Sequence, residues 1–213
     1  MSSLTQTQTR ARGRADSTLL DSARDLFMQI GLRRCSMDDI ARHAGISRAT
    51  LYRQFRHRPA LVQAVILREC RRAMATIEQQ VRHLPAIEQG RQGLFLTFHL
   101  AARHPLLQQL LKLDAESVLP LLTIDSATTL NWGQQFSTEL VRYFQRQGLF
   151  PGLAAADVGE LLFRLMHSWL LTPAGHVDAR QEDSLHRYVD QFLWPLLNNL
   201  GNGAAVAPVK PDR

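Results

Sequence analysis

Apolar residues recur along this chain with the spacing of an α-helix over almost its whole length. In the first such stretch, Leu19, Ala23 and Leu26 stand at positions i, i+4 and i+7 of one helical face. Alternating apolar and polar segments joined by Asn-Gly or Asp-Gly turns, which would predict β-hairpins, are missing from the sequence. The pattern therefore predicts an all-α protein.

Helix-breaking residues and the apolar spacing together place the predicted elements. Helices are predicted at 17–31, 36–43, 48–54, 59–81, 86–102, 105–112, 114–147, 154–171 and 180–200. Pro120 or Gly133 is expected to interrupt the helix in which they lie, and Pro195 is expected to bend or fray the last one. Residues 1–15 and 201–213 lack a helical pattern, and we predict that they are flexible tails.

The segment MDDIARHAGISRATLYRQFR, which begins at Met37, has the pattern of a helix-turn-helix motif. Ala41 is small where two helices would cross closely, and Gly45 stands in the predicted turn, where a positive φ is cheap only for glycine. Ser36, in a capping box, and Ser47 are predicted to cap the two helices. The second helix is then left with exposed side chains that can enter a DNA groove.

The net charge of the chain is concentrated at one end. The formal charge is +6, and residues 1–60 carry all of this excess, with eleven arginines against five aspartates. Residues 61–213 carry 14 basic and 14 acidic side chains. A basic head suits a polyanion and a neutral body suits a different partner. The motif and the charge together predict a DNA-binding domain over residues 16–62 that follows a basic tail.

The exposed face of the second motif helix supplies candidate contacts to double-stranded DNA. Arg48 and Arg53 can each pair with guanine in the major groove, and Thr50 can meet a thymine methyl group. The remaining candidates are neighbouring capping, small, aromatic and basic side chains, namely Ser36, Ser47, Ala49, Tyr52 and Arg58. For Tyr52, packing against the first helix is as plausible as contact with a phosphate group. A merely solvated basic face, the alternative for the arginines, is disfavoured by the charge excess.

Residues 17–65 resemble the DNA-binding domain of the TetR family of bacterial transcription regulators. The matching stretches are LLDSARDLFMQIGL and SMDDIARHAGISRATLYRQFRHRPALVQAV, in which the family's recurring Tyr-x-x-Phe stands as Tyr52 to Phe55. Where the family commonly has lysine near the start of its fourth helix, this chain has Arg58 followed by Pro59. The resemblance implies a homodimer formed through the last two helices and a ligand pocket in the C-terminal body.

Residues 63–200 are accordingly expected to form a larger helical domain for ligand binding and dimerisation, joined to the head by the long helix over 59–81. Its neutral, aromatic-rich composition suits a pocket for a lipophilic or aromatic small molecule. The candidate ligand-binding residues are Phe95, Phe98, His99, Trp132, Phe136, Met166 and His167. For any one of them, ordinary core packing is the alternative. The apolar stripes of the last two helices either form half of a four-helix dimer bundle or cover the core of the monomer.

Catalytic, metal and cofactor motifs are missing from the sequence, so we expect neither an enzyme nor a cofactor or metal. Glu78, Asp114 and Glu116 are spaced as solvated residues on helix faces. Cys35 and Cys70 are too few for a disulfide framework and are expected to be free, buried thiols. No signal peptide is recognised and no stretch approaches the roughly 18 apolar residues of a membrane span, which predicts a cytoplasmic protein without a membrane partner.

These features favour a dimeric, ligand-responsive transcriptional regulator, most simply a repressor that binds a near-palindromic operator. In this hypothesis a ligand in the body favours another arrangement, and the helix over 59–81 carries the change to the head. One alternative is an architectural protein that binds DNA without regard to sequence, against which the neutral body argues. The other alternative is a small-molecule carrier, which would leave the basic head unexplained.

Overall fold

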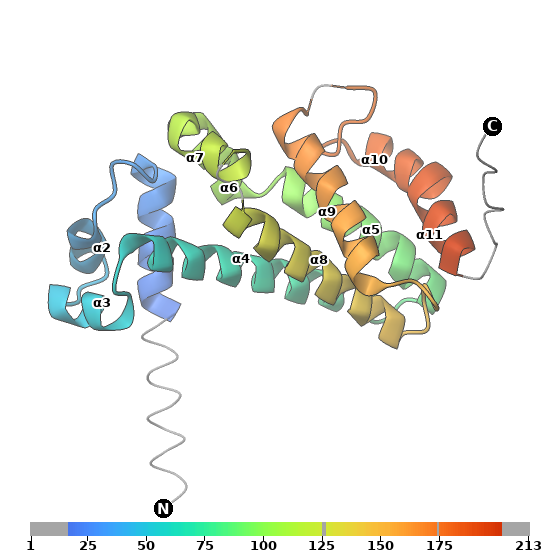
Figure 1. The fold of residues 1–213 in the computed structure, drawn as a ribbon, viewed down its shortest axis with the longest axis horizontal. Coiled ribbons are helices and arrows are strands. Elements are labelled where there is room, and N and C mark those ends of the chain that lie inside the picture. Colours follow the sequence, from blue (N-terminus) through green and yellow to red (C-terminus); the bar gives the residue numbers. More distant parts are fainter. Residues whose placement is uncertain (1–16, 125–126, 174, 202–213) are drawn as a thin grey trace, which may run out of the picture. The chain divides into compact units, whose positions relative to one another are not determined.

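The computed structural model describes residues 17–124, 127–173 and 175–201, and these form helices joined by turns and loops, without a β-strand (Figure 1). Residues 17–30 form the first helix. The later elements are α2 (Met37–His43), α3 (Arg48–Gln54), α4 (Arg58–Val81), α5 (Ala86–Ala102), α6 (Pro105–Leu113), α7 (Ala115–Leu122), α8 (Ala127–Arg146), α9 (Ala155–Leu171), α10 (Glu182–Tyr188), the π-helical turn η1 (Val189–Leu193) and α11 (Trp194–Gly201). The predicted all-α class is confirmed. None of the described helices is both long and apolar enough to cross a membrane.

The described helices form two compact units. The first contains residues 17–71 and 105–124, and the second contains residues 72–104 and 127–201. Helix α4 therefore contributes its first part to one unit and its last part to the other. Helices α6 and α7 belong with the N-terminal helices, a grouping that the sequence does not reveal. The predicted tail over 1–15 and nearly all of the C-terminal one lie outside the described residues.

The first unit is built around the apolar faces of its N-terminal helices. The helix over 17–30 ends at Gly31, whose φ of +79° allows its N–H to reach the Phe27 carbonyl oxygen at 3.1 Å. The side chains of Phe27, Ile40 and Leu51, one from each of the first three helices, are at most 1% exposed. Burial of these side chains holds the three helices together.

Paired charges join the helix over 17–30 to α4. The Arg24 Nε atom lies 3.1 Å from a Glu69 carboxylate oxygen, and the Arg68 Nη1 atom lies 3.0 Å from an Asp21 carboxylate oxygen. The Arg68 and Glu69 side chains are only 12% and 11% exposed. Buried charges are tolerated when each has a partner, and removal of one partner leaves the other charge at high cost. These pairs therefore fix the helix over 17–30 against the first part of α4.

The second unit packs around α5, with α8 and α9 running alongside one another (Figure 1). Small residues allow the close contacts in this unit. A Cβ at Gly133 on α8 would lie 1.8 Å from the ring of Phe163 on α9, and a Cβ at Gly93 on α5 would lie 2.0 Å from the ring of Phe144. Each glycine therefore provides the space that an aromatic ring fills.

One helix prediction is wrong in detail. The predicted helix over 114–147 is interrupted neither at Pro120, which lies inside α7, nor at Gly133, which lies inside α8. Instead, α7 ends at Leu122 and α8 begins at Ala127. Gly133 does not break the helix. It leaves the space that the Phe163 ring occupies.

The last predicted helix, over 180–200, contains the π-helical turn η1 just before Pro195. Pro195 is the second residue of α11 and does not end it, because the π-helical turn η1 precedes it and the Trp194 N–H bonds to the Val189 carbonyl oxygen. A π-helical turn absorbs the geometry that a proline imposes on the preceding turn of a helix. The helix therefore reaches Gly201.

Candidate nucleic-acid interface

Helix α2 and the turn after it have the predicted motif geometry. The Ser36 hydroxyl oxygen accepts a hydrogen bond from the Asp39 N–H at 3.1 Å, and an Asp39 carboxylate oxygen accepts one from the Ser36 N–H at 3.1 Å. This completes the predicted capping box. The hydrogen bonds from the Ser36 hydroxyl and backbone lower the pKa of the Asp39 carboxyl. Gly45 in the following turn has a φ of +66°, as the sequence predicts.

Helix α3 is anchored on one face and open on the other. Leu51 is fully buried, whereas Arg48, Ala49, Tyr52 and Arg53 are exposed and Thr50 is half-buried. Ser47 is an exposed cap, and its hydroxyl oxygen accepts a hydrogen bond from the Thr50 N–H at 3.1 Å. The first turn of α3 contains no acidic residue. This helix end therefore offers capped backbone N–H groups and positive side chains without a repelling carboxylate of its own.

The arginines of α3 are available at the surface. The Arg48 side chain is 71% exposed and forms an ion pair with Asp38 of α2. An exposed ion pair of this kind is worth about 0–1 kcal/mol, so a nucleic acid can displace Asp38 from Arg48 at little cost. Tyr52 is 46% exposed and therefore does not belong to the core.

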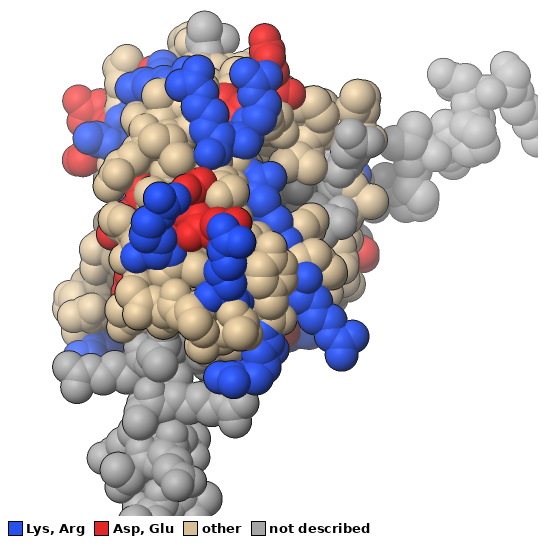
Figure 2. Space-filling view, turned by 90° about the vertical axis from the view of Figure 1, so that its left-hand side faces the viewer, with Lys and Arg blue, Asp and Glu red and all other residues tan. Residues whose placement is uncertain are grey.

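Further arginines surround the motif, although the sequence did not single them out as site residues. Those with exposed positions in the head are Arg33, Arg34, Arg42 and Arg56. Figure 2 shows basic side chains spread across this side of the molecule, with a few acidic side chains among them. Arg42 is paired with Asp39. The only feature of the sequence that points to these arginines is the excess of positive charge over residues 1–60, because none of them belongs to a recognised motif position.

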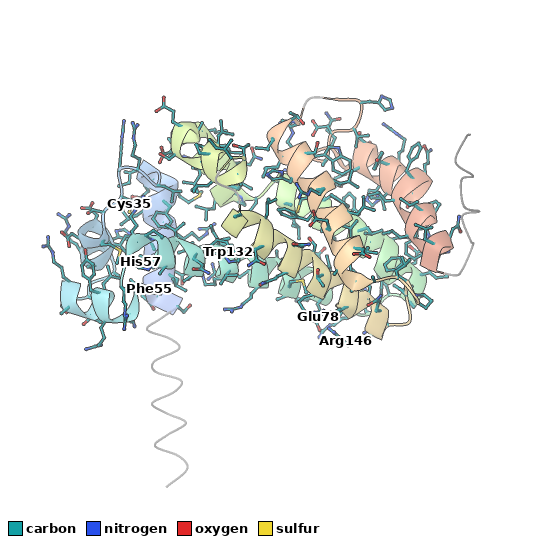
Figure 3. All side chains as sticks on the ribbon, viewed as in Figure 1. Cys35, Phe55, His57, Glu78, Trp132 and Arg146 are labelled. Carbon is teal, nitrogen blue, oxygen red and sulfur yellow. The ribbon has the colours of Figure 1, made fainter. Side chains whose placement is uncertain are left out.

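Arg58 differs from the other candidates because it points inward. Its Nη2 atom donates a hydrogen bond to the Leu32 carbonyl oxygen, in the turn between the first helix and α2. Its Nε atom is buried, and no described residue accepts a hydrogen bond from it. The neighbouring His57 and Phe55 lie at the junction of α3 and α4 (Figure 3), where the His57 Nδ1 atom accepts a hydrogen bond from the Ala60 N–H at 3.2 Å.

The burial of Asp114 differs from what the sequence predicts. The sequence places it on a solvated helix face with Glu78 and Glu116, which are indeed exposed, but Asp114 is only 8% exposed. Its carboxylate lies over the turn after the first helix and accepts a hydrogen bond from the Arg33 N–H at 2.5 Å. The two residues are separated by 81 positions, so no local pattern reveals the contact.

Candidate ligand-binding residues on α5 belong to an aromatic cluster in the second unit. Phe95 and Phe98 are 5% and 1% exposed. The Phe95 ring stacks on His99 with centroids 5.1 Å apart and on His186 of α10 with centroids 3.7 Å apart. A His99 ring nitrogen lies 3.3 Å from the Ala179 carbonyl oxygen. These side chains pack together and are satisfied by the protein itself.

The other candidates come from α8 and α9. Trp132 lies near the start of α8 (Figure 3), and both it and Phe136 are half-buried. Met166 and His167 on α9 are also half-buried, and the His167 ring stacks on Phe163 with centroids 5.7 Å apart. Through Phe163 and Gly133, this part of α9 meets the part of α8 that carries Trp132.

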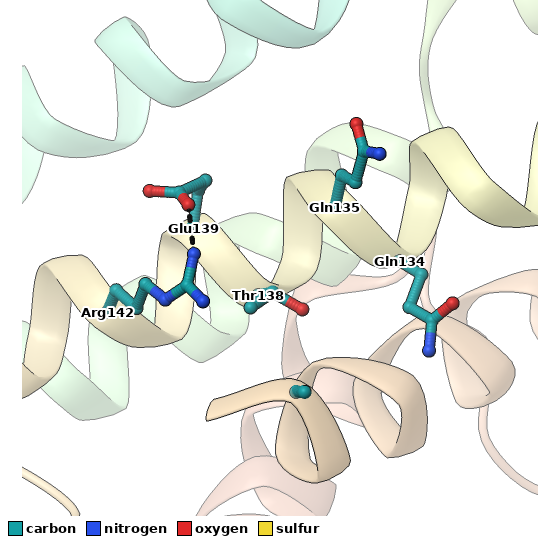
Figure 4. Close-up of a pocket in the computed structure, with 6 residues that line it drawn as sticks. Gln134, Gln135, Thr138, Glu139 and Arg142 are labelled. Atoms are coloured by element: carbon teal, nitrogen blue, oxygen red, sulfur yellow. Dashed lines mark hydrogen bonds and ion pairs between the residues drawn. The ribbon is translucent and has the colours of Figure 1, made fainter. Parts of the chain in front are cut away.

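A surface groove of about 420 Å³ is lined by residues of α8 and α9. Its lining, drawn in Figure 4, consists of Gln134, Gln135, Thr138, Glu139, Arg142 and Ala156. The Arg142 guanidinium donates a hydrogen bond to Glu139 at 2.5 Å along its edge. None of the candidate ligand-binding residues lines this groove.

The thiols and the metal-ligating side chains carry no site in the described ranges. Cys35, in the turn before α2 (Figure 3), and Cys70, on α4, are both free, as predicted, although Cys70 is only half-buried. Burial raises the pKa of the Cys35 thiol to about 11, against a smaller opposing effect of Arg58. Among the described residues, no group of three His, Cys, Asp or Glu side chains is placed to hold a metal ion.

The N-terminal residues are similar to known regulatory proteins. A family model described as "Bacterial regulatory proteins, tetR family" matches residues 19–65. The HTH-type transcriptional regulator UidR of Escherichia coli (strain K12) is 40% identical over 57 residues, which are 27% of this chain and 29% of UidR. An uncharacterized HTH-type transcriptional regulator of Mycobacterium tuberculosis (strain CDC 1551 / Oshkosh) is 48% identical over 58 residues, which are 27% of this chain and 29% of that protein. The matched segment thus spans less than a third of each curated relative.

The fold of most of the chain is similar to that of solved structures of regulatory proteins. The crystal structure of the TetR family repressor AlkX from Dietzia sp., a protein implicated in biodegradation of n-alkanes, superposes with a TM-score of 0.60 at 19% identity. The superposition covers 85% of this chain and 94% of that chain. The superposed residues extend well beyond the N-terminal motif. At 19% identity, the comparison shows similarity of fold alone. The matched proteins are named as regulators and not as enzymes.

Proposed function

We propose that this chain is a homodimeric transcriptional repressor of the TetR type, which a small molecule releases from a near-palindromic operator. The match of residues 19–65 to the model of the tetR family of bacterial regulatory proteins supports this proposal. The observation that carries this proposal is the capped, outward-facing helix α3, with Arg48 and Arg53 exposed and Leu51 anchored in the core. A helix displayed in this way can enter the major groove while α2 crosses the backbone.

The side chains of α3 have the chemistry of base readout. A guanidinium group can donate two hydrogen bonds to the O6 and N7 atoms of guanine, and a good bidentate pair gives about 1–3 kcal/mol of discrimination. Arg48 and Arg53 are proposed for this role, with Ala49 and Thr50 close to thymine methyl groups. Ser36, Ser47 and Tyr52 are proposed to contact phosphate groups, because each is exposed at the edge of the motif.

Arg58 is the least direct of the proposed DNA contacts. Its guanidinium is engaged with the Leu32 carbonyl oxygen in the free protein. It reaches a phosphate group only if that hydrogen bond is exchanged. Its effect on DNA binding is therefore expected to combine a contribution to the head's structure with a charge contribution.

Dimerisation is supported by the outer surface of the last helices. Large apolar side chains are 37–59% exposed there, namely Leu161 on α9, Phe192 in η1, and Leu196 and Leu200 on α11. Two heads brought about one helical turn of DNA apart by such a dimer would read a two-fold symmetric site. A single head buries little DNA surface, so the second copy adds the affinity that one lacks.

A lipophilic or aromatic effector is supported by the aromatic composition of the second unit, in which Phe95, Phe98, His99, Trp132, Phe136, Met166 and His167 remain the proposed contacts. Such an effector regulates DNA binding only if it binds two arrangements of the protein with different affinity. Because the Phe95 cluster is tightly packed, binding there requires that these side chains separate. The effector would then stabilise the separated arrangement.

The DNA proposal is tested with the full chain and a pool of random double-stranded DNA. Duplexes retained through repeated selection are sequenced, and the affinity for one such duplex is compared with a scrambled duplex of equal composition across a range of salt concentrations. Specific binding is expected to exceed nonspecific binding by about a thousandfold or more. The selected sites should contain two related half-sites. Equal affinity for both duplexes would support the architectural alternative instead.

A matched pair of variants isolates the role of α3. Arg48→Ala is expected to weaken binding to the selected duplex about tenfold or more and to relax its base preference at one position. Arg142 on α8 has the same charge as Arg48 and is likewise exposed and ion-paired. Arg142→Ala is expected to leave the affinity for the duplex unchanged. If the two variants behaved alike, Arg48 would act only through net charge.

The effector proposal is tested on protein as it is purified from cells. Organic extraction followed by mass spectrometry should yield a lipophilic or aromatic molecule, and adding the same compound from a pure stock should release the selected duplex. Retention of the duplex at saturating compound would contradict release by that compound.

A further inference from the structure

One peptide group in the DNA-binding domain forms hydrogen bonds to two oppositely charged side chains, one through its carbonyl oxygen and one through its N–H. The carbonyl oxygen of the Leu32–Arg33 peptide accepts a hydrogen bond from the Arg58 guanidinium at the start of α4. The N–H of the same peptide donates to the Asp114 carboxylate, at the start of α7, over 2.5 Å. Hydrogen bonds to ionised groups are about twice as strong as neutral ones. The orientation of this peptide is therefore fixed from both sides.

The contact between Asp114 and the turn is a close and buried one. Gly31 lies so near that a Cβ at this position would be 3.1 Å from the Asp114 Cβ atom, and Asp114 is 8% exposed. Burial raises the pKa of the Asp114 carboxyl. Hydrogen bonds from the Arg33 N–H and the Ser117 side chain, with the charges of Arg33 and Arg58, outweigh this effect and leave the pKa below its usual value. The group is therefore a carboxylate at neutral pH.

Glu116, which lies two residues further on, provides a contrast within the same segment. Its carboxylate lies 3.3 Å from the Arg33 guanidinium, but the two side chains are 87% and 65% exposed. An exposed pair of this kind contributes little, because water and salt screen it. The segment thus holds the turn through Asp114, and Glu116 is a natural control with the same charge.

The turn that Asp114 holds leads directly into the DNA-binding motif. Ser36, the cap of α2, follows Arg33 by three residues, and α2 in turn packs on α3. The Cys35 N–H also bonds to the Leu32 carbonyl oxygen, at 3.2 Å, which stiffens the turn. A rotation of the Leu32–Arg33 peptide would therefore move the start of α2 and, with it, the direction in which α3 faces.

We propose that Asp114 is a positioning residue for DNA binding, which sets the orientation of the helix-turn-helix motif by holding the Leu32–Arg33 peptide. The role in DNA binding rests on the proposed function, whereas the hold on the turn does not. Asp114 belongs to the segment formed by α6 and α7, and any displacement of this segment would release the turn. The segment is thus a control element of the head, although it lies outside the motif in sequence.

Amide hydrogen exchange in the full chain, without DNA, tests the hold itself. Peptides covering residues 31–43 are followed by mass spectrometry in the wild type, Asp114→Ala, Asp114→Asn and Glu116→Ala. Exchange in 31–43 is expected to be at least tenfold faster in Asp114→Ala. Asp114→Asn should restore part of the protection, because its amide oxygen still accepts a hydrogen bond. Glu116→Ala should match the wild type. Equal protection of 31–43 in all four proteins would overturn the proposal.

DNA binding by the same proteins tests the positioning role. On a duplex selected by the wild type, Asp114→Ala is expected to lose at least tenfold in affinity and Asp114→Asn less, while Glu116→Ala stays within twofold. The dependence of affinity on salt should keep its slope, because Asp114 contacts no phosphate group. Faster exchange with unchanged DNA affinity would overturn the positioning role.

Two further outcomes distinguish failure of the proposed function from failure of the proposed role of Asp114. If Asp114→Ala does not fold, as judged by its thermal unfolding, the comparison of Asp114→Asn with Glu116→Gln decides both measurements. If the wild type selects no duplex, the proposed function and the positioning role both fail, while the exchange result still decides whether Asp114 holds the turn.

Discussion

Gly159 on α9 and Thr138 on α8 meet backbone against backbone. A Cβ at position 159 would lie 2.7 Å from the Thr138 nitrogen and 2.9 Å from its Cα atom. Real Cβ atoms do not approach backbone atoms this closely, so the absence of a side chain at Gly159 is what allows the two helices to cross here. Thr138 is itself only 8% exposed, which shows how tightly the crossing is sealed.

Gly159→Ala is expected to destabilise the second unit, because the added methyl group forces α8 and α9 apart. Overpacking of this kind costs about 1–3 kcal/mol, even though alanine is the better helix former by about 1 kcal/mol. Urea denaturation followed by circular dichroism measures the change. Ser168→Ala, at an exposed position of α9, is the control and should change the free energy of unfolding by less than about 0.5 kcal/mol. A Gly159→Ala variant as stable as this control would contradict a rigid crossing.

The proposed dimer surface predicts different effects for two equally exposed side chains. Phe192 in η1 and Ile87 on α5 are each 59% exposed, but only Phe192 belongs to the apolar surface of the last helices. Phe192→Glu would bury a carboxylate in the dimer and should weaken association about tenfold or more. Sedimentation velocity at several protein concentrations measures this. Ile87→Glu should remain dimeric, and a wild-type monomer would refute the dimer.

The two thiols are expected to resist alkylation while the chain is folded. Burial raises the pKa of the Cys35 thiol to about 11, and burial with the charge of Glu69 raises the pKa of the Cys70 thiol. Because the thiolate is the nucleophile, Cys35 should present about a hundredfold less of it at neutral pH than an ordinary thiol. Iodoacetamide labelling read by mass spectrometry should modify both cysteines rapidly only in denaturant. Fast labelling of Cys35 in the native protein would show that its turn opens.

Asp178 should make the stability of the second unit depend on acid pH. Hydrogen bonds from the Arg180 side chain and backbone N–H lower the pKa of the Asp178 carboxyl to about 2. A lowered pKa in the folded state contributes stability above the ordinary value of about 3.9 and loses it as the pH falls towards 2. Asp178→Asn should therefore be less stable than the wild type near neutral pH, with the difference shrinking in acid. Urea midpoints at several pH values measure this, and a pH-independent difference would contradict the assignment.

The head could be predicted from the sequence because its signals are local. Ser36 and Ser47 as caps and Gly45 in the turn each act within four residues of their own position, and the structure reproduces all three. Helical periodicity likewise needs only neighbouring residues, which is why most helix ranges agree with the prediction.

Contacts between distant segments could not be predicted in this way. Asp114 looks like a surface carboxylate in its own segment, and its burial comes from a turn 81 residues earlier. Gly133 looks like a helix breaker until the ring of Phe163 is placed against it. The aromatic residues of the second unit were predicted to form a binding site, but stacking such as that of Phe95 on His186 is not encoded in their spacing. How these residues serve a ligand is therefore still a prediction.

The dependence of the head on Asp114 has a consequence for protein engineering. A chimera that grafts residues 1–62 of this protein onto another regulator's body would leave the Leu32–Arg33 peptide N–H without its carboxylate. Such a hybrid needs the segment over 105–124 as well, or an acidic side chain supplied by the recipient at the matching place. The transplantable module is thus defined by contacts in space and is discontinuous along the chain.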